Sequence, residues 1–247
     1  MKKIKLLVLP LILFLLIYVV LFQTFYTKFL IQNCDKVYKK HLEEYVITTS
    51  YKSESKKALT IYLKEKPEIS SPAHYDYLNN FSDKNISDSG CIVASSINDF
   101  TYTSFIYDDL KNFISSINFL KKTEYLISFE LNHVHYECDI VPNNHTIIEE
   151  HLKSEHFNGI LDINLLIDSN NIINETRYDN LCSEISSFCF EHFNSYNINR
   201  IRIDISNTPS LEKYSSFNLE NAFISDPSII NNIISFDYYK EKRAISS

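Results

Sequence analysis

Two histidines and a glutamate stand at alternate positions near the middle of the chain, as His133, His135 and Glu137. If this segment is a β-strand, the three side chains project from one face, because successive strand residues point to opposite sides. Imidazole and carboxylate groups gathered in this way bind transition metals. The opposite face (residues 134, 136, 138 and 140) is apolar, so the pattern favours a water-exposed polar face. A transition-metal site and a pH-sensitive recognition surface are the alternatives.

Three aspartates form a second group of chemically competent side chains. Asp162, Asp168 and Asp204 fall on the polar positions of two segments that alternate between apolar and polar residues. Paired carboxylates perform acid–base chemistry when a cleft holds them close together. No nucleophile or oxyanion-binding motif accompanies them, so we interpret them as part of a polar sheet surface, on which Arg202 pairs with Asp162 across neighbouring strands.

Five cysteines allow a disulfide but indicate no redox or zinc motif, because no CxxC pair occurs. Cys182 and Cys189 are seven residues apart on a predicted helix, which places them about 10 Å apart and too far from each other to bond. Buried cysteine commonly packs as a small apolar residue, and we expect this of the pair. Cys91 and Cys138 are the candidate disulfide.

Composition excludes several classes of function. The chain has only two glycines, whereas a P-loop, a Rossmann fingerprint or a nucleophile elbow each needs several at fixed offsets. Its formal net charge is −7, and the first three lysines lie before residue 6, so the remainder is more acidic still. Such a surface repels phosphate backbones, which disfavours nucleic acid as a partner.

The clearest elements lie at 160–168, 177–196 and 200–206. In the two flanking segments every second position is apolar and most positions between them are polar, which is typical of half-buried strands. The intervening segment has apolar residues at helical spacing. A strand, a helix and a strand of these lengths predict a right-handed crossover that joins two parallel neighbours.

The preceding segments complete an α+β core over 99–207. Residues 100–107 have strand composition, and Asp108 is placed to cap a helix over 109–121. Residues 124–141 alternate with a change of parity, which predicts a hairpin, and a helix follows at about 146–155. This order resembles a ferredoxin-like βαββαβ unit with an added helix and strand. An irregular part over 47–98, with a strand at 58–63, precedes the core, and a weakly patterned segment over 208–247 follows it.

The N-terminal region predicts a membrane anchor. Residues 6–27 carry no charge and are long enough to cross about 30 Å of hydrocarbon. No small-residue cleavage site follows, which favours an uncleaved anchor over a signal peptide. Three lysines in the stub at 1–5 place the N-terminus in the cytoplasm and the bulk of the chain outside it. Residues 28–46 continue as a juxtamembrane helix.

These observations predict a single-pass membrane protein whose extracytoplasmic α+β domain is a binding or assembly module. The expected partner is another protein of the envelope or secretory pathway, an analogy of architecture because no motif supports it. The alternatives are a metal-dependent enzyme and a pH or ligand sensor, both of which would use His133, His135 and Glu137. The sequence predicts no cofactor besides that transition metal.

Overall fold

The computed structural model of the chain describes residues 14–18, 21, 25, 28, 31–32, 45–52, 56–73, 86–134, 139–169, 175–216 and 219–240. The chain divides into two compact units, Met1–Glu43 and Glu44–Ser247. Most of the predicted anchor (6–27) and juxtamembrane helix (28–46) lies outside the described residues, and those described before residue 33 are helical. Within the described part of the chain, no helix has the length and apolar character of a membrane span.

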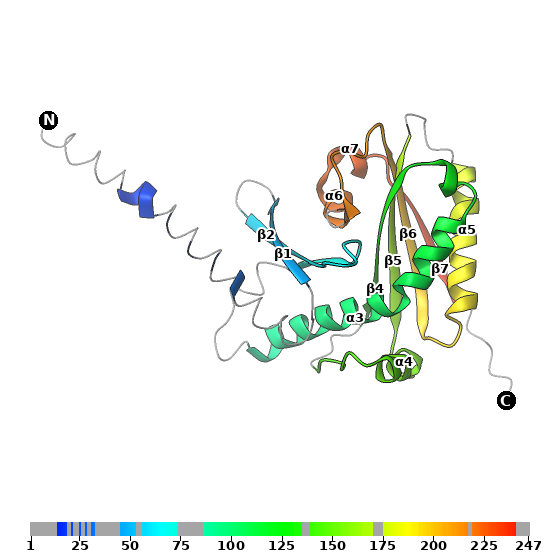
Figure 1. The fold of residues 1–247 in the computed structure, drawn as a ribbon, viewed down its shortest axis with the longest axis horizontal. Helices are drawn as coiled ribbons and strands as arrows, with labels where there is room; N and C mark the ends of the chain where they lie inside the picture. Colours follow the sequence, from blue (N-terminus) through cyan, green and yellow to red (C-terminus); the bar gives the residue numbers. More distant parts are fainter. Residues whose placement is uncertain are drawn as a thin grey trace, which may run out of the picture. The chain divides into compact units, whose positions relative to one another are not determined.

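A four-stranded mixed sheet forms the centre of the second unit, and with its helices it confirms the predicted α+β class (Figure 1). The two central strands run parallel, as the crossover pattern predicts, and each pairs antiparallel with an outer strand. In spatial order the strands are β4 (Tyr125–His133), β5 (Gly159–Asp168), β6 (Ile198–Thr208) and β7 (Ile234–Tyr239).

Strand alternation gives this sheet one apolar and one polar face. Leu161, Ile163 and Leu165 of β5 are at most 1% exposed, as are the matching isoleucines of β6. Two helices cover this apolar face, α3 (Ile86–Ser116) and α5 (Glu175–His192), and α5 is the predicted crossover (Figure 1). Phe113 of α3 and Phe188 of α5 stack with ring centroids 3.8 Å apart, so the two helices also pack against each other.

Shorter elements close the ends of the sheet. Helix α4 (His145–Lys153) begins at Asn144, whose side chain accepts hydrogen bonds from two backbone N–H groups of the first turn. A 3-10 turn, η1 (Leu120–Lys122), links α3 to β4. After β6 the chain forms α6 (Leu219–Ser225) and α7 (Pro227–Ile230), on the opposite face of the sheet from α3 and α5 (Figure 1).

A second, antiparallel sheet precedes α3. Its strands are β1 (Tyr45–Lys52), β2 (Lys56–Leu63) and β3 (Ser70–Ala73), in that spatial order. Strand β2 contains the predicted strand at 58–63. Two ion pairs join the turn between β2 and β3 to α3, since Lys66 Nζ lies 3.3 Å from Asp108 Oδ2 and Lys111 Nζ lies 2.9 Å from Glu68 Oε1.

The predicted strand at 100–107 is wrong, because these residues belong to the long helix α3. Asp108 therefore lies inside a helix and does not begin one. Aromatic and β-branched composition indicates a strand, but the buried residues of this segment pack against the sheet as a helix. Among the described residues, no strand of the four-stranded sheet precedes α3, so the opening strand of a βαββαβ order is missing there. The described helices and strands from α3 to β6 follow the order αβαβαβ.

The C-terminal segment has more structure than its sequence pattern indicates. Helices α6 and α7 and strand β7 all lie within 208–247. Asp226 caps α7 by accepting a hydrogen bond from the backbone N–H of Ser228, and Pro227 occupies the first turn, where its missing N–H has no cost. This segment adds both an edge strand and the helix that bounds the candidate site.

Candidate functional site

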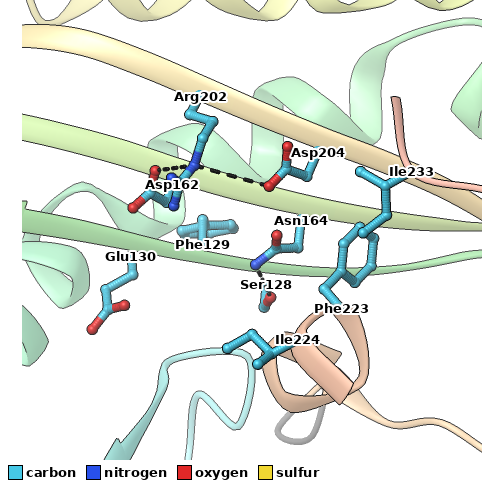
Figure 2. A pocket seen from close by; sticks show the side chains of 10 residues that line it. All are labelled: Ser128, Phe129, Glu130, Asp162, Asn164, Arg202, Asp204, Phe223, Ile224 and Ile233. Atoms are coloured by element: carbon cyan, nitrogen blue, oxygen red, sulfur yellow. Dashed lines mark hydrogen bonds and ion pairs between the residues drawn. The ribbon is translucent and has the colours of Figure 1, made fainter. Parts of the chain in front are cut away.

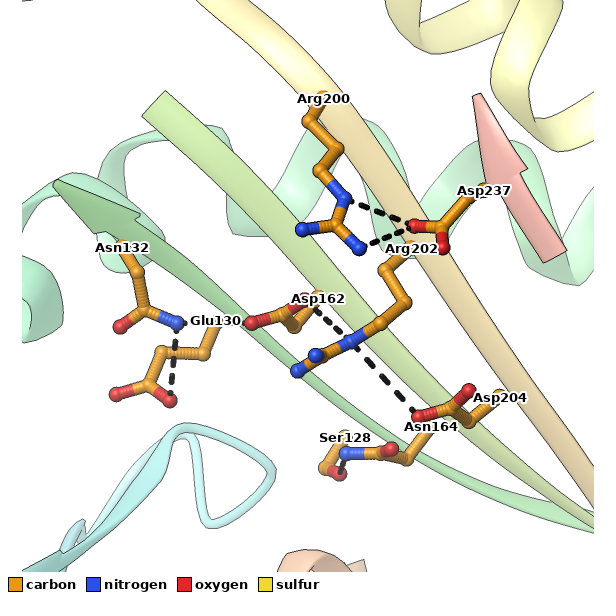
Figure 3. Close-up of polar contacts among 9 residues, drawn as sticks. All are labelled: Ser128, Glu130, Asn132, Asp162, Asn164, Arg200, Arg202, Asp204 and Asp237. Carbon is orange, nitrogen blue, oxygen red and sulfur yellow. Dashed lines mark hydrogen bonds and ion pairs between the residues drawn. The ribbon is translucent and has the colours of Figure 1, made fainter. Parts of the chain in front are cut away.

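The polar face of the sheet carries two rows of facing side chains, one residue from each strand. The strand register places Glu130, Asp162, Arg202 and Asp237 opposite one another in the first row. The second row consists of Ser128, Asn164, Asp204 and Ser235. Within each strand the two positions are two residues apart, so both side chains lie on one face of the sheet, opposite the buried core. Figure 3 shows the side chains of these two rows, except that of Ser235.

An ion pair at the centre of these rows confirms the predicted pairing of Arg202 with Asp162. Arg202 Nε lies 3.0 Å from Asp162 Oδ1 and 3.9 Å from Asp204 Oδ2 (Figure 3). The 3.0 Å contact is an ion pair without hydrogen-bond geometry, because Asp162 Oδ1 has no hydrogen-bond partner among the described residues. The other oxygen of Asp162 accepts a hydrogen bond from Asn132 Nδ2 at 3.1 Å.

A pocket of about 130 Å³ opens beside this ion pair (Figure 2). The strands supply its polar wall, and the segment around α6 supplies an apolar wall of Phe223, Ile224 and Ile233. The remaining lining residues are Ser128, Phe129, Glu130, Asp162, Asn164, Arg202 and Asp204. On the polar wall, Asn164 Nδ2 donates a hydrogen bond of 3.3 Å to Ser128 Oγ.

The position of α6 follows from a change of character along β5. Leu166 has the same parity as Asp162 and Asn164, yet it is fully buried. It forms a small apolar cluster with Leu219 and Phe223 of α6 and with Ile229 of α7. Helix α6 is thus held over the apolar end of this face, and the pocket lies at the border where the face becomes polar.

The carboxylates of the pocket differ in their surroundings. Burial raises the pKa of Asp162, the nearby charge of Asp204 adds to this, and Arg202 and Asn132 partly oppose it. Asp204 is only 21% exposed at its side chain, and its buried Oδ1 has no hydrogen-bond partner among the described residues. Nor do the described residues give the terminal nitrogens of Arg202 a hydrogen bond or ion pair, since both of its ionic contacts use Nε. The pocket therefore contains charged groups whose hydrogen-bonding capacity is unused.

No family model, curated protein or solved structure matches this chain. The chemistry of the site consequently rests on its own residues.

The predicted metal ligands fall only partly within the described residues. His133 ends β4, whereas His135 and Glu137 lie outside the described ranges. His133 stacks on Phe157 with ring centroids 5.1 Å apart, and its Nε2 lies 3.1 Å from the carbonyl oxygen of His156. Because a carbonyl only accepts, this nitrogen must donate a proton and cannot bind a metal in this arrangement. Across the described ranges, no three His, Cys, Asp or Glu side chains gather to hold a metal ion.

The cysteines of α5 are buried thiols that do not bond to each other, as predicted. Cys182 and Cys189 are both free, and burial raises the pKa of each thiol to about 12. A thiol with so high a pKa carries almost no thiolate near neutral pH and is a poor nucleophile. The candidate disulfide stays a prediction. Cys91 lies in α3, but Cys138 is outside the described residues, so the structure does not test the bond.

Of the three aspartates singled out from the sequence, Asp162 and Asp204 line the pocket and Asp168 does not. The alternation of 124–131 already placed Ser128 and Glu130 opposite an apolar face, which is the signal that could have added them. The apolar wall from Phe223 to Ile233 had no such signal, because it depends on how α6 folds back over the sheet.

Proposed function

We propose that this chain is a protein-binding module that receives a side chain of its partner in the polar-face pocket. The volume of the pocket carries the proposal. Pockets that enclose small-molecule ligands measure roughly 300–1,000 Å³, whereas this one measures about 130 Å³. A space of that size suits one anchoring side chain of a larger partner better than a free metabolite or cofactor.

The lining of the pocket supports the same function. Protein interfaces are anchored by a few residues that fill well-packed pockets with both apolar and polar walls. Ile224 is 50% exposed at the rim and offers apolar surface around the entrance. Ser128 Oγ contacts the amide of Asn164, which does not accept a proton, so the described lining supports recognition rather than nucleophilic catalysis.

In this proposal the N-terminal helix anchors the module in a membrane, and the α+β unit lies outside the cytoplasm. The uncharged sequence of 6–27 supports an anchor, and the described apolar side chains within it are exposed, from Phe14 at 69% to Ile17 and Leu21 at 50%. Such side chains are stabilised by lipid. The partner is then another protein of the envelope or secretory pathway.

Crosslinking and affinity capture of the full chain from its own membrane tests this function. We expect Ile224→Asp to reduce recovery of a specific crosslinked protein at least about tenfold, because it places a charge in an apolar contact. Ile147→Asp is the matched control, since Ile147 is 41% exposed on α4 and does not line the pocket. Equal recovery with both variants, or no crosslinked protein with the wild type, would contradict the proposal.

A further inference from the structure

We infer that the side chain received by the pocket is basic, an ammonium or guanidinium group on an aliphatic stem. This inference rests on the proposed function and specifies its partner. Its central observation is Asp204, whose side chain lines the pocket and is 21% exposed, and whose buried Oδ1 has no hydrogen-bond partner among the described residues. Carboxylates held in such surroundings are normally matched by a cationic donor.

The balance of charge in the pocket favours a cation. Its lining contains three acidic side chains, Glu130, Asp162 and Asp204, and one basic side chain, Arg202. Arg202 already pairs with Asp162, so the described residues leave Asp204 without a cation at hydrogen-bond distance. An incoming ammonium or guanidinium is therefore attracted by the carboxylate of Asp204, and an incoming carboxylate is repelled by it.

The position of Arg202 does not satisfy Asp204. Arg202 Nε lies 3.0 Å from Asp162 but 3.9 Å from Asp204, which is beyond hydrogen-bond distance. A second cation can thus approach Asp204 without displacing the first ion pair. Figure 2 shows Asp204 and Asn164 on neighbouring strands, with Phe223 and Ile233 beside them.

The apolar wall suits the stem of a basic side chain. Lysine and arginine lay their methylene groups along apolar surface while the charged end reaches a polar group. In this pocket Phe223, Ile224 and Ile233 lie on one side, and the carboxylates lie on the strands. The free terminal nitrogens of Arg202 suit the opposite ligand, a carboxylate. The experiment must therefore distinguish a basic ligand from an acidic one.

Three small probes of equal chain length separate these chemistries: n-butylammonium, butan-1-ol and butyrate. Each is titrated at constant ionic strength into the full-length ¹⁵N-labelled chain, and NMR follows the backbone amides of Asn164 and Asp204. The Nε–H signal of Arg202 reports the ion pair, and the chain has only four arginines to assign. We expect saturable shifts with butylammonium and at least about fivefold weaker binding of the other two probes.

Variants complete the test. Asp204→Asn should weaken butylammonium binding at least about fivefold. Asp179→Asn, which removes the same charge from an exposed position on α5, should leave it unchanged. Tighter binding of butyrate, equal binding of butanol, or no shift with butylammonium would overturn the inference. If any of these occurs while capture of the partner still depends on Ile224, the proposed function stands and only the basic nature of the ligand is refuted.

Discussion

Replacing Arg202 with methionine should destabilise the fold by removing the only described cation in contact with Asp162. Methionine keeps an unbranched stem but has neither charge nor donor. Asp162 is 18% exposed at its side chain, so water only partly replaces the lost arginine. The carboxylate left behind, rather than the lost contact itself, produces most of the cost.

The distances give the size of the effect. Two unit charges 3.0 Å apart attract by about 1.4 kcal/mol in water and about 5.5 kcal/mol at an effective dielectric constant of about 20. Arg202 is 44% exposed, so solvent screens the pair and the upper value does not apply. We therefore expect Arg202→Met to lower the free energy of unfolding by about 1–3 kcal/mol at pH 7.

Arg200→Met is the matched control on the same strand face. Arg200 pairs with Asp237 at 2.8 Å, but Asp237 is 39% exposed and regains water when its partner is removed. Exposed pairs of this kind contribute about 0.2–1 kcal/mol. Urea unfolding of the full chain, followed by circular dichroism, compares the two variants under identical conditions.

The dependence on pH identifies the cause. The pKa of Asp162 is raised in the folded state, so its contribution to stability is present below the unfolded value and is lost as pH rises through the folded value. Without Arg202 this folded pKa rises further. The difference between wild type and Arg202→Met should therefore shrink between about pH 7 and about pH 4. A difference that stays constant over this range, or equal losses for both arginine variants, would refute the electrostatic explanation.

Three further predictions follow from packing and charge elsewhere in the unit. Gly159→Ala should lower the free energy of unfolding by about 1–3 kcal/mol, because an added Cβ would lie 2.6 Å from Phe157 Cε1. In thermal unfolding, adding Phe157→Leu to Gly159→Ala should restore part of the lost stability, and an unchanged stability of Gly159→Ala itself would contradict the prediction. Lys111→Met should lower the free energy of unfolding by about 1–2 kcal/mol at pH 7. Burial acts to raise the pKa of Glu68, but the hydrogen bond from Lys111 helps to bring it below its usual value, so the contribution of Glu68 to stability is present above its unfolded pKa and is lost as pH falls through its folded pKa. The loss caused by Lys111→Met should therefore be smaller at about pH 3, and urea unfolding that shows an equal loss at both pH values would contradict this explanation. Iodoacetamide should alkylate Cys182 at about pH 8 at least about 10³-fold more slowly than a free thiol, because its pKa is about 12; mass spectrometry measures this rate, and rapid labelling of the folded chain would refute it.

The parallel pair and its helix could be predicted from the sequence because their patterns are long and mostly regular. Apolar and polar residues alternate from Leu161 to Leu165 in β5 and from Ile201 to Ile205 in β6, and the helix between the strands has the length that a crossover needs. The same alternation identified the polar face and the pairing of Arg202 with Asp162. Periodicity sets the face of the sheet on which each side chain lies. Once two strands are known to be neighbours, their pairing then identifies which side chains face each other.

Helix α3 could not be recognised over 100–107 because tertiary contacts decide the conformation there. The hydroxyl of Thr101 donates to the carbonyl of Ile97, which satisfies it within the helix. Thr103 accepts a hydrogen bond from the backbone N–H of Leu131, and Asp99 accepts one from that of His133. The side chains of Asp99 and Thr103 thus pair with backbone N–H groups along the outer edge of β4. Composition alone does not reveal this role, because it indicates only that the segment has strand propensity.

The pocket was beyond reach of the sequence for a different reason. Its polar wall requires the register of three strands, of which only the parallel pair was predicted. Its apolar wall comes from a segment at residues 223–233. The sequence patterns of this segment are too short and weak to predict where it lies relative to the sheet. Asp204 was visible as a polar strand residue, but its lack of a hydrogen-bond partner is a property of the folded chain.

The central claim is that the polar-face pocket contacts another protein, and site-specific photocrosslinking tests it most directly. A benzophenone amino acid is placed at Ile224, or at Ile147 as the control of similar exposure, and the full chain is irradiated in its own membrane. We predict one discrete protein adduct from position 224 that is absent from position 147. Identical adducts from both positions, or none from position 224, would contradict the account.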